Sequence, residues 1–355
     1  MAITSSGAAT AAPTRSAVTP LQVSVMSMQL IGNSAAATQK INVNDFKTYV
    51  NTDVDKYWSW ATVGRTDVKV VSTKANVRAK TANRKMSTGQ LMSSVIRDAG
   101  FKPVKNRVTV VIVPEASLAG STGFAQWYGD LNSGLILMPQ KSTLSKAALI
   151  HEFGHIFGID HANTLSCGSR KMDATFNTKT RTFSDRSCYS QEYADNLDVM
   201  GLQHVDSPMV SAPVWDAKKF GDRKEIRDIT KATTGKSYTY TIKPWSAGGD
   251  NRAVKFRDPK TKEIYYLELR APKGYDSVWA KKGNRGVKIT RLDNSRPYAT
   301  GSIALRPSSA PSGYFLDYNI TWQAGKTFTT TGGTKVKINK VSDTSASVTI
   351  TLPRA

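Results

Sequence analysis

Residues 151–161 read His-Glu-Phe-Gly-His-Ile-Phe-Gly-Ile-Asp-His and constrain the fold of this chain more than any other segment. Three of the four histidines in the 355 residues fall within this segment. An α-helix turns about 100° per residue, so His151 and His155 project from the same face of a helix. Gly158 favours an end to that helix, because glycine tolerates the left-handed conformation that turns the chain. We therefore expect His161 to approach the same point from another direction.

Three imidazoles that converge in this way form a ligand set for Zn²⁺. They leave a fourth position of a tetrahedral ion open for water, as in catalytic zinc sites. Zinc lowers the pKa of that water to about 7 and polarises a carbonyl oxygen. Glu152 lies one step round the helix from His151, where it can take the water's proton and pass it to a leaving amine. The alternative is a buried or structural histidine cluster.

The residues around this motif predict the packing of the helix. Leu149, Phe153, Ile156 and Phe157 recur at helical spacing, roughly opposite the histidines. Such a stripe is typical of a helix face that packs on a core. We assign it no functional role.

The zinc motif and the segment Glu192-Tyr-Ala-Asp-Asn-Leu-Asp-Val-Met-Gly201 together resemble the metzincin zinc peptidases, in particular the gametolysin-like branch. The resemblance implies that Met200 forms a hydrophobic floor beneath the zinc and is not a ligand. Some metzincins carry a tyrosine two residues after this methionine, where the present chain has Leu202. We therefore assign no catalytic tyrosine, although Tyr193 lies nearby in the sequence. Oxyanion stabilisation would fall mainly to zinc.

The resemblance covers roughly residues 18–224, and their pattern agrees with it. Alternating or β-branched segments predict strands at 21–30, 68–71, 108–113 and 135–138. Residues 43–60 and 87–99 have helical spacing. This order of strands and helices ahead of the zinc helix is the one expected of the upper half of a metzincin. Residues 120–129 would form the cleft rim and an edge strand that a substrate peptide could extend, or else a plain surface hairpin.

The pattern of apolar and polar residues changes near Asp222. Short segments with period-2 alternation follow, separated by Gly, Pro, Asn and Asp, and predict an antiparallel β-sandwich over residues 225–355. The expected class is therefore α+β: a metzincin-type catalytic domain over 18–224, with a twisted mixed sheet and an active-site helix, followed by an all-β domain. Residues 1–17 are rich in Ala, Ser and Thr, and we expect a flexible leader or the remnant of a pro-segment there.

The two cysteines and the charge bear on location and partners. Cys167 and Cys188 flank a polar loop, and a disulfide between them suits an extracellular protein; two free thiols are the alternative. The formal net charge of +22 favours anionic partners such as cell-wall or matrix polymers, or reflects a solvated surface. The chain has no nucleic-acid-binding motif, which argues against DNA or RNA as partner. It also has no apolar run long enough to span a membrane.

These observations predict a secreted, monomeric zinc endopeptidase that acts on protein or peptide substrates, with secretion implied by the resemblance. His151, His155 and His161 would bind one zinc ion, and Glu152 would be the general base. A non-catalytic protein that binds an envelope or matrix polymer on the same scaffold is the main alternative. A hydrolase of non-peptide amides or esters is another. Asp195 and Asp198 are candidate Ca²⁺ ligands, although isolated acidic pairs more often cap turns or accept surface hydrogen bonds.

Overall fold

The computed structural model of the chain describes residues 20–118, 121–140, 145–202, 206–296, 299–314 and 317–354. The leader expected at residues 1–17 lies outside these ranges. None of the helices in the described part of the chain has the length and apolar character needed to cross a bilayer.

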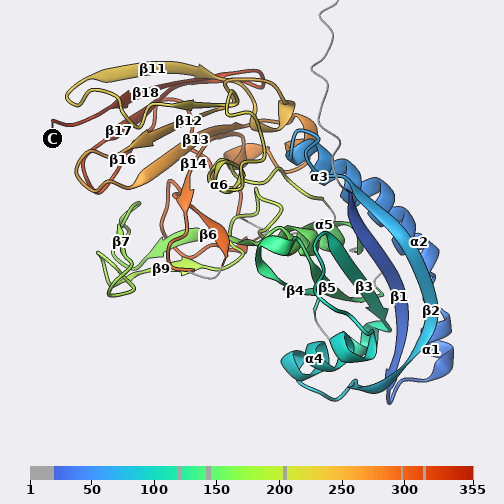
Figure 1. Ribbon diagram of the computed structural model, residues 1–355. Helices are drawn as coiled ribbons and strands as arrows, with labels where there is room; N and C mark the ends of the chain where they lie inside the picture. Colours follow the sequence, from blue (N-terminus) through green and yellow to red (C-terminus); the bar gives the residue numbers. More distant parts are fainter. Residues whose placement is uncertain are drawn as a thin grey trace, which may run out of the picture.

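A twisted mixed sheet organises the N-terminal half (Figure 1). Its strand order is β2-β1-β3-β5-β4. The first four of these strands run parallel to their neighbours, and β4 runs antiparallel to β5. The strands span Leu21–Ile31 (β1), Val68–Asn83 (β2), Arg107–Val113 (β3), Phe124–Trp127 (β4) and Gly134–Pro139 (β5).

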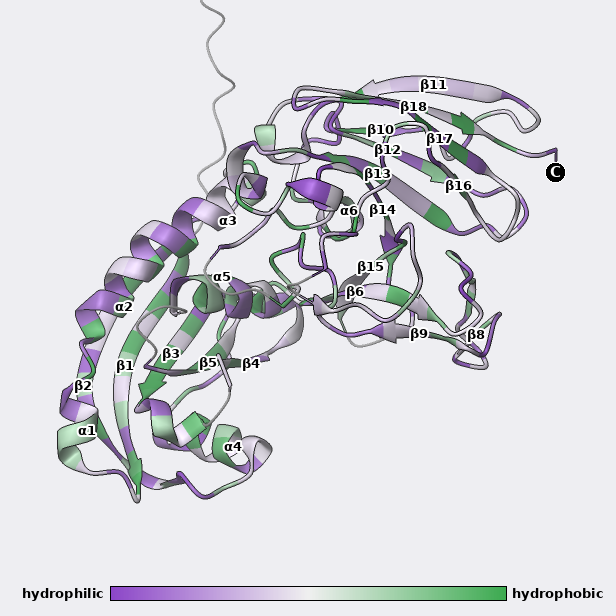
Figure 2. Ribbon diagram, turned by 180° about the vertical axis from the view of Figure 1, so that it is seen from behind, coloured by the Kyte–Doolittle hydropathy of each residue, from purple (hydrophilic) through white to green (hydrophobic). Residues whose placement is uncertain are grey.

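Helices cover both faces of this sheet. The α2 helix, the π-helical turn η1 and the α3 helix form one continuous helical stretch, and this stretch and α5 share a buried core with β1, β3 and β5. The α4 helix packs on the opposite face, against the other side chains of the same strands. Figure 2 shows the hydrophobic residues of β1, β3 and β5 beneath helices that carry many hydrophilic residues. The helices span Ala35–Gln39 (α1), Val43–Tyr49 (α2), Val50–Val54 (η1), Asp55–Ala61 (α3), Thr88–Asp98 (α4) and Ser145–Ile156 (α5).

The C-terminal half contains two further sheets that pack face to face. The larger has the order β10-β12-β13-β14-β15-β6-β9, and the smaller is antiparallel with the order β11-β18-β17-β16. Apolar side chains from both sheets form one core, which includes Phe256, Leu267, Ile338 and Ile350. The strands span Ile159–Cys167 (β6), Cys188–Gln191 (β9), Ile226–Asp228 (β10), Ser237–Ile242 (β11), Ala253–Arg257 (β12), Ile264–Arg270 (β13), Gly286–Leu292 (β14), Thr300–Ala304 (β15), Thr327–Thr329 (β16), Lys335–Val341 (β17) and Ala346–Thr351 (β18).

Short elements complete the fold. A small hairpin pairs β7 with β8, and the α6 helix lies between the two halves in sequence. These elements and the 3-10 helices span Phe176–Asn177 (β7), Thr182–Phe183 (β8), Ala212–Ala217 (α6), Glu115–Leu118 (η2), Gly129–Leu131 (η3), Trp245–Ala247 (η4), Gly274–Asp276 (η5) and Lys282–Asn284 (η6).

The observed elements confirm the α+β class and most of the predicted strands and helices. Two features differ from the expectation of an antiparallel sandwich. The pairs β10–β12 and β15–β6 are parallel, and β6 and β9 come from residues before 225. The larger sheet thus takes strands from both sides of the expected domain boundary. The division at residue 224 stays a prediction.

The expected disulfide is present between Cys167 and Cys188. The two residues face each other at the end of the antiparallel β6–β9 pair, with their Cα atoms 3.9 Å apart. The bridge closes a loop with a sequence separation of 21 residues that contains the β7–β8 hairpin. It ties that hairpin to the larger sheet.

Candidate metal centre

The segment 151–161 folds as its spacing predicts. His151 and His155 lie one turn apart on α5, and Gly158 takes a positive φ of 68° just after the helix. His161 follows at the start of β6. Within the described ranges, one group of three or more His, Cys, Asp or Glu residues could hold a metal ion, and these three histidines form that group. Their ligand atoms lie within 4.8 Å of one another.

Hydrogen bonds fix the orientation of all three rings. Nδ1 of His151 lies 2.9 Å from the carbonyl oxygen of Val199, and Nδ1 of His155 lies 2.8 Å from that of Ile159. A carbonyl oxygen only accepts, so Nδ1 of these two rings carries the proton and donates. Nε2 is then left with a free lone pair on each ring. This tautomer is the one in which Nε2 can bind a metal.

A carboxylate performs the same role for the third ring. Nδ1 of His161 lies 2.7 Å from Oε1 of Glu192, which follows β9. Arg296, in the segment between β14 and β15, holds the other oxygen of Glu192 at 2.8 Å. Metal-bound histidines are commonly oriented by carboxylates in this way. The sequence analysis did not identify Glu192 or Arg296 as functional residues.

Burial keeps the rings neutral. It lowers the pKa of His155 to about 4, and the nearby His161 adds to the effect. Burial and the neighbouring histidines also hold the pKa of His151 well below its usual value. The pKa of His161 is lowered as well, by burial, against the opposing effect of Glu192. Neutral imidazoles with convergent lone pairs are the state that binds a divalent transition metal.

Glu152 lies behind the triad on the same helix. Its side chain is 4% exposed, and burial raises its pKa to about 8. Its Oε2 atom has no hydrogen-bond partner in the described part of the chain. A Cβ atom on Gly123 would lie only 2.9 Å from the other carboxylate oxygen, Oε1. A side chain at position 123, just before β4, would therefore clash with the Glu152 carboxylate, and glycine avoids this clash.

Met200 packs directly beneath the helix that carries the ligands. It is buried, and a Cβ atom on Gly154 would approach its Sδ atom to 2.3 Å, so α5 and the Met200 side chain are in close contact. The carbonyl of the preceding residue, Val199, is the one that accepts the His151 hydrogen bond. The turn around Met200 is thus adjacent to the triad, while its role as a floor for the metal stays a prediction.

Tyr193 contacts the triad, although no motif position in the sequence predicted this contact. Its ring centroid lies 3.7 Å from that of His161. Its φ of 59° is in the left-handed region, which is costly for a tyrosine. Burial and nearby carboxylates, first among them Glu152, raise the pKa of its phenol far above the usual value. Leu202, at the position where some metzincins have a tyrosine, instead donates its backbone N–H to the Tyr193 carbonyl.

The candidate calcium ligands are engaged by other groups. Asp195 accepts from the backbone N–H of Leu197 and pairs with the buried Lys288 at 2.6 Å. Asp198 accepts from the backbone N–H groups of Met200 and Ser211. Both carboxylates therefore stabilise the turn around Met200 through protein hydrogen bonds, and no observation supports calcium there.

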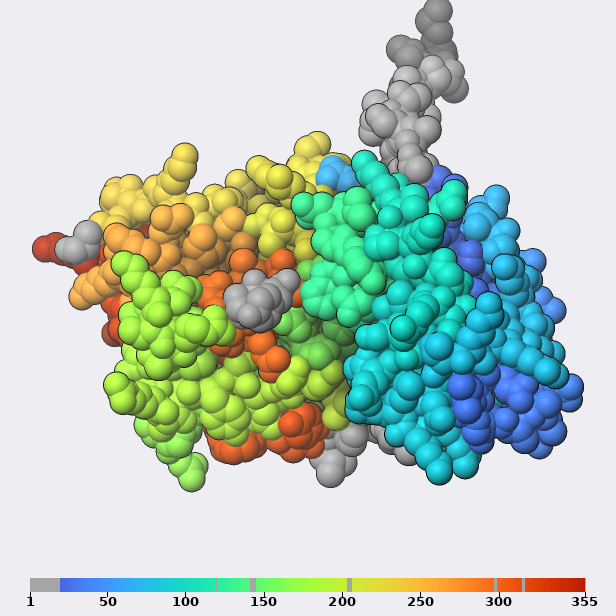
Figure 3. Space-filling view, turned by 60° about the horizontal axis from the view of Figure 1, so that its bottom comes forward, coloured from blue at the N-terminus to red at the C-terminus, as the bar shows by residue number. Residues whose placement is uncertain are grey.

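The triad lies at the junction of the two halves, because α5 packs on the N-terminal sheet and β6 belongs to the larger C-terminal sheet. Figure 3 shows the green surface near residue 150 set back between the teal N-terminal half and the orange and yellow-green segments. The β4 strand, at the edge of its sheet, contacts α5. The Trp127 ring at the end of β4 stacks 6.3 Å from the His155 ring.

Comparison with known proteins adds little to this site. No family model matches the chain, and no curated protein matches it. A solved chain from a "Structure of a chaperone-substrate complex" is 12% identical, with a TM-score of 0.28, over 57% of this chain and 34% of that one. Likeness at this level carries no argument about fold or function.

Proposed function

We propose that the protein is a zinc-dependent endopeptidase of the metzincin type. The observation that carries the proposal is the triad of neutral imidazoles, His151, His155 and His161, with their Nε2 atoms free. Beside it on α5 lies Glu152, whose Oε2 atom has no hydrogen-bond partner in the described part of the chain. The parallel sheet with its antiparallel edge strand, beside the helix that carries the motif, also supports a metzincin-type fold. The chain's own disulfide supports an extracellular location.

The donor set fits zinc. Three histidine nitrogens are the protein ligands of many catalytic zinc sites, which keep one coordination position for water or substrate. When bound, the ion would supply Lewis acidity, polarising the substrate carbonyl and lowering the pKa of water to about 7. Glu192 and the backbone carbonyls of Val199 and Ile159 would hold the three rings in place.

Glu152 would move the proton. Its free Oε2 atom can accept a proton from the attacking water, and the protonated acid can then give it to the departing amine nitrogen. Burial raises the pKa of Glu152 above its usual value, which favours the step in which the carboxylate takes up the proton. The phenol of Tyr193 stays protonated at neutral pH, so it can donate a hydrogen bond to negative charge that develops beside the triad.

The substrate would bind as an extended strand. The β4 strand is the outer strand of its sheet and lies next to α5. A peptide that pairs with this edge would gain main-chain hydrogen bonds without a specific sequence. Such binding would carry a scissile bond past the triad.

Replacing the proposed base tests the mechanism. In Glu152→Ala, we expect the protein to retain zinc and to lose hydrolysis of casein by at least about 100-fold, the usual contribution of general acid–base catalysis. Bound zinc measured by atomic absorption and release of peptides measured by mass spectrometry provide the two readouts. The exposed Glu115→Ala variant is the matched control.

The outcome also separates the rival functions. Equal casein cleavage by the Glu152→Ala and wild-type proteins would contradict the mechanism. A wild-type protein that binds zinc but cleaves neither proteins nor peptides would favour a binding protein on this scaffold. Turnover of small esters or non-peptide amides alone would favour the other hydrolase classes.

A further inference from the structure

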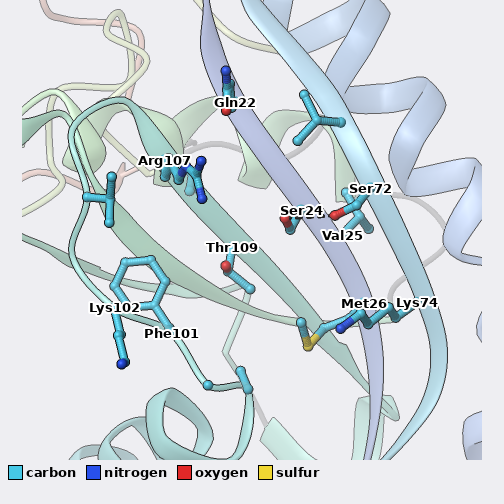
Figure 4. Close-up of a pocket in the computed structure, with 15 residues that line it drawn as sticks. Gln22, Ser24, Val25, Met26, Ser72, Lys74, Phe101, Lys102, Arg107 and Thr109 are labelled. Carbon is cyan, nitrogen blue, oxygen red and sulfur yellow. Dashed lines mark hydrogen bonds between the residues drawn. The ribbon is translucent and has the colours of Figure 1, made fainter.

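A cavity of about 510 Å³ lies on the same face of the N-terminal sheet as α4, on a part of that face that the helix does not cover. Strands β1, β2 and β3 form its base, and the turn after α4 forms its wall (Figure 4). Phe101 and Lys102 lie in that turn, where Gly100 takes a positive φ of 64°. The cavity shares no lining residue with the candidate metal centre.

Strand register places the polar side chains of this cavity on one face. Ser24 pairs with Ser72 on one side and with Thr109 on the other. The neighbouring residues Val23 and Val25 belong to the core under the helices on the opposite face. The hydroxyls of Ser24 and Ser72 lie 2.8 Å apart and form a hydrogen bond. Figure 4 shows the hydroxyls of Ser24, Ser72 and Thr109 at the centre of the cavity.

The charged residues of the cavity are all basic. Lys74, Lys102 and Arg107 line it, and no Asp or Glu does. The three side chains are exposed, and none has an ion-pair partner among the residues that the structure describes. Arginine and lysine beside hydroxyl groups are a common arrangement for sulfate and phosphate groups, and arginine can bind such a group through two N–H donors.

We propose that this cavity binds sulfate or phosphate esters carried on a polysaccharide. The three cations would contact the anionic esters, and the serine and threonine hydroxyls would contact the sugar hydroxyls. Nucleic acid fits less well, because single strands bind on exposed aromatic rings. The one aromatic residue of the cavity, Phe101, is half-buried and packs against Tyr128 with ring centroids 5.7 Å apart. The proposal is independent of the proposed peptidase activity.

Calorimetric titration of the full chain with a heparin octasaccharide tests the proposal. We expect the variant Lys74→Gln/Lys102→Gln/Arg107→Gln to bind the octasaccharide about tenfold more weakly than wild type, as the loss of three exposed charge pairs implies. The matched control is Lys231→Gln/Lys260→Gln/Lys326→Gln, which removes the same charge from exposed positions in the C-terminal half. We expect this control to stay within about twofold of wild type.

Further arms distinguish the sources of the anion. Inorganic sulfate should compete only at much higher concentration than the octasaccharide, and desulfated octasaccharide should not bind. Equal weakening in the control, or none in the cavity variant, would overturn the proposal. So would tighter binding of a single-stranded oligonucleotide, or of inorganic sulfate, at the same residues. Thermal melting checks that each variant is folded. If the triple variant does not fold, Arg107→Gln alone replaces it, and we expect this single variant to bind the octasaccharide about twofold more weakly than wild type.

Discussion

Of the three candidate ligands, only His161 lies outside α5, so its position depends on contacts beyond the helix. Glu192 accepts the Nδ1 hydrogen bond of His161 and is itself held by Arg296. We expect Glu192→Ala to lower zinc affinity about tenfold or more, because a carboxylate that accepts the Nδ1 hydrogen bond of a ligand histidine fixes the orientation and basicity of that ring. Competition with a chromophoric chelator measures this affinity directly.

Glu192→Gln separates orientation from charge. An amide oxygen can still accept the His161 hydrogen bond, so this variant should bind zinc more tightly than Glu192→Ala. The exposed Glu115→Ala substitution should leave the affinity unchanged. Zinc affinity equal to wild type in Glu192→Ala would show that His161 needs no orienting carboxylate.

The sequence predicted those parts of the site that depend on local geometry. The spacing of His151, His155 and Gly158 is a helical repeat and a turn, and both formed as expected. Glu192 and Arg296 reach His161 only through tertiary contacts, from distant points in the chain. No periodicity or motif marks such residues, because their role arises from the pairing of strands that are far apart in sequence.

At the level of elements, the β-branched strands were predicted well and the polar ones were not. The β3 strand is a continuous β-branched run and was identified. The β6 strand, Ile159–Cys167, was not predicted, because its buried residues Asn163 and Ser166 are polar and interrupt the apolar pattern expected of a buried strand. Their side chains donate hydrogen bonds to Asp293 and Gln191, which offsets the cost of burying these polar groups. The β2 strand also extends well beyond the predicted 68–71, as an exposed strand at the edge of its sheet.

The last part of β2 is held by a single carboxylate on α4. Asp98 accepts hydrogen bonds from the backbone N–H groups of Lys80, Thr81 and Ala82 at 2.8–2.9 Å. Partial burial would raise the pKa of Asp98, but these bonds outweigh it and lower the pKa below its usual value. We expect Asp98→Asn to lower the free energy of unfolding at pH 7 by about 2 kcal/mol, the typical value of hydrogen bonds to a charged group.

The pH dependence of this effect follows from the direction of the shift. A depressed pKa in the folded protein gives stability that is fully present above the unfolded value of 3.8 and is lost as the pH falls through the folded value. Urea unfolding at pH 7 and at successively lower pH should therefore show the gap between wild type and Asp98→Asn narrowing below pH 4. The exposed Asp45→Asn variant should show a smaller gap. A constant gap for Asp98→Asn would contradict the assignment.

At the scale of the molecule, the change of sequence pattern near Asp222 precedes most of the short strands, although β7, β8 and β9 lie before it. It does not reveal that β15 pairs in parallel with β6, because the pairing of distant strands leaves no local signal. This pairing places His161 and the segment after β14 side by side. The C-terminal half is therefore a direct neighbour of the candidate metal centre.

A buried ionic network also joins the two halves. Lys288 on β14 is fully buried, and its Nζ atom lies 2.6 Å from Asp195 and 3.7 Å from Glu268. It also donates to the carbonyl oxygen of Leu197 and to the hydroxyl of Ser211. These contacts fix the backbone that leads to Val199, whose carbonyl orients His151. One lysine of the C-terminal half thus supports the turn beneath the triad.

Removing this lysine should therefore weaken both stability and metal binding. In Lys288→Met, the carboxylate of Asp195 loses its buried cation, whereas Glu268 keeps Arg270 at 2.9 Å. Breaking a buried ion pair by removal of one partner costs about 3–5 kcal/mol. Urea unfolding and zinc competition on the same samples measure the two effects. Lys335→Met, at an exposed position of β17, is the control and should change neither. Unfolding of Lys288→Met at the same urea concentration as wild type would mean that the network does not hold the halves together. A loss of stability with unchanged zinc affinity would mean that the turn around Met200 does not control metal binding by the triad.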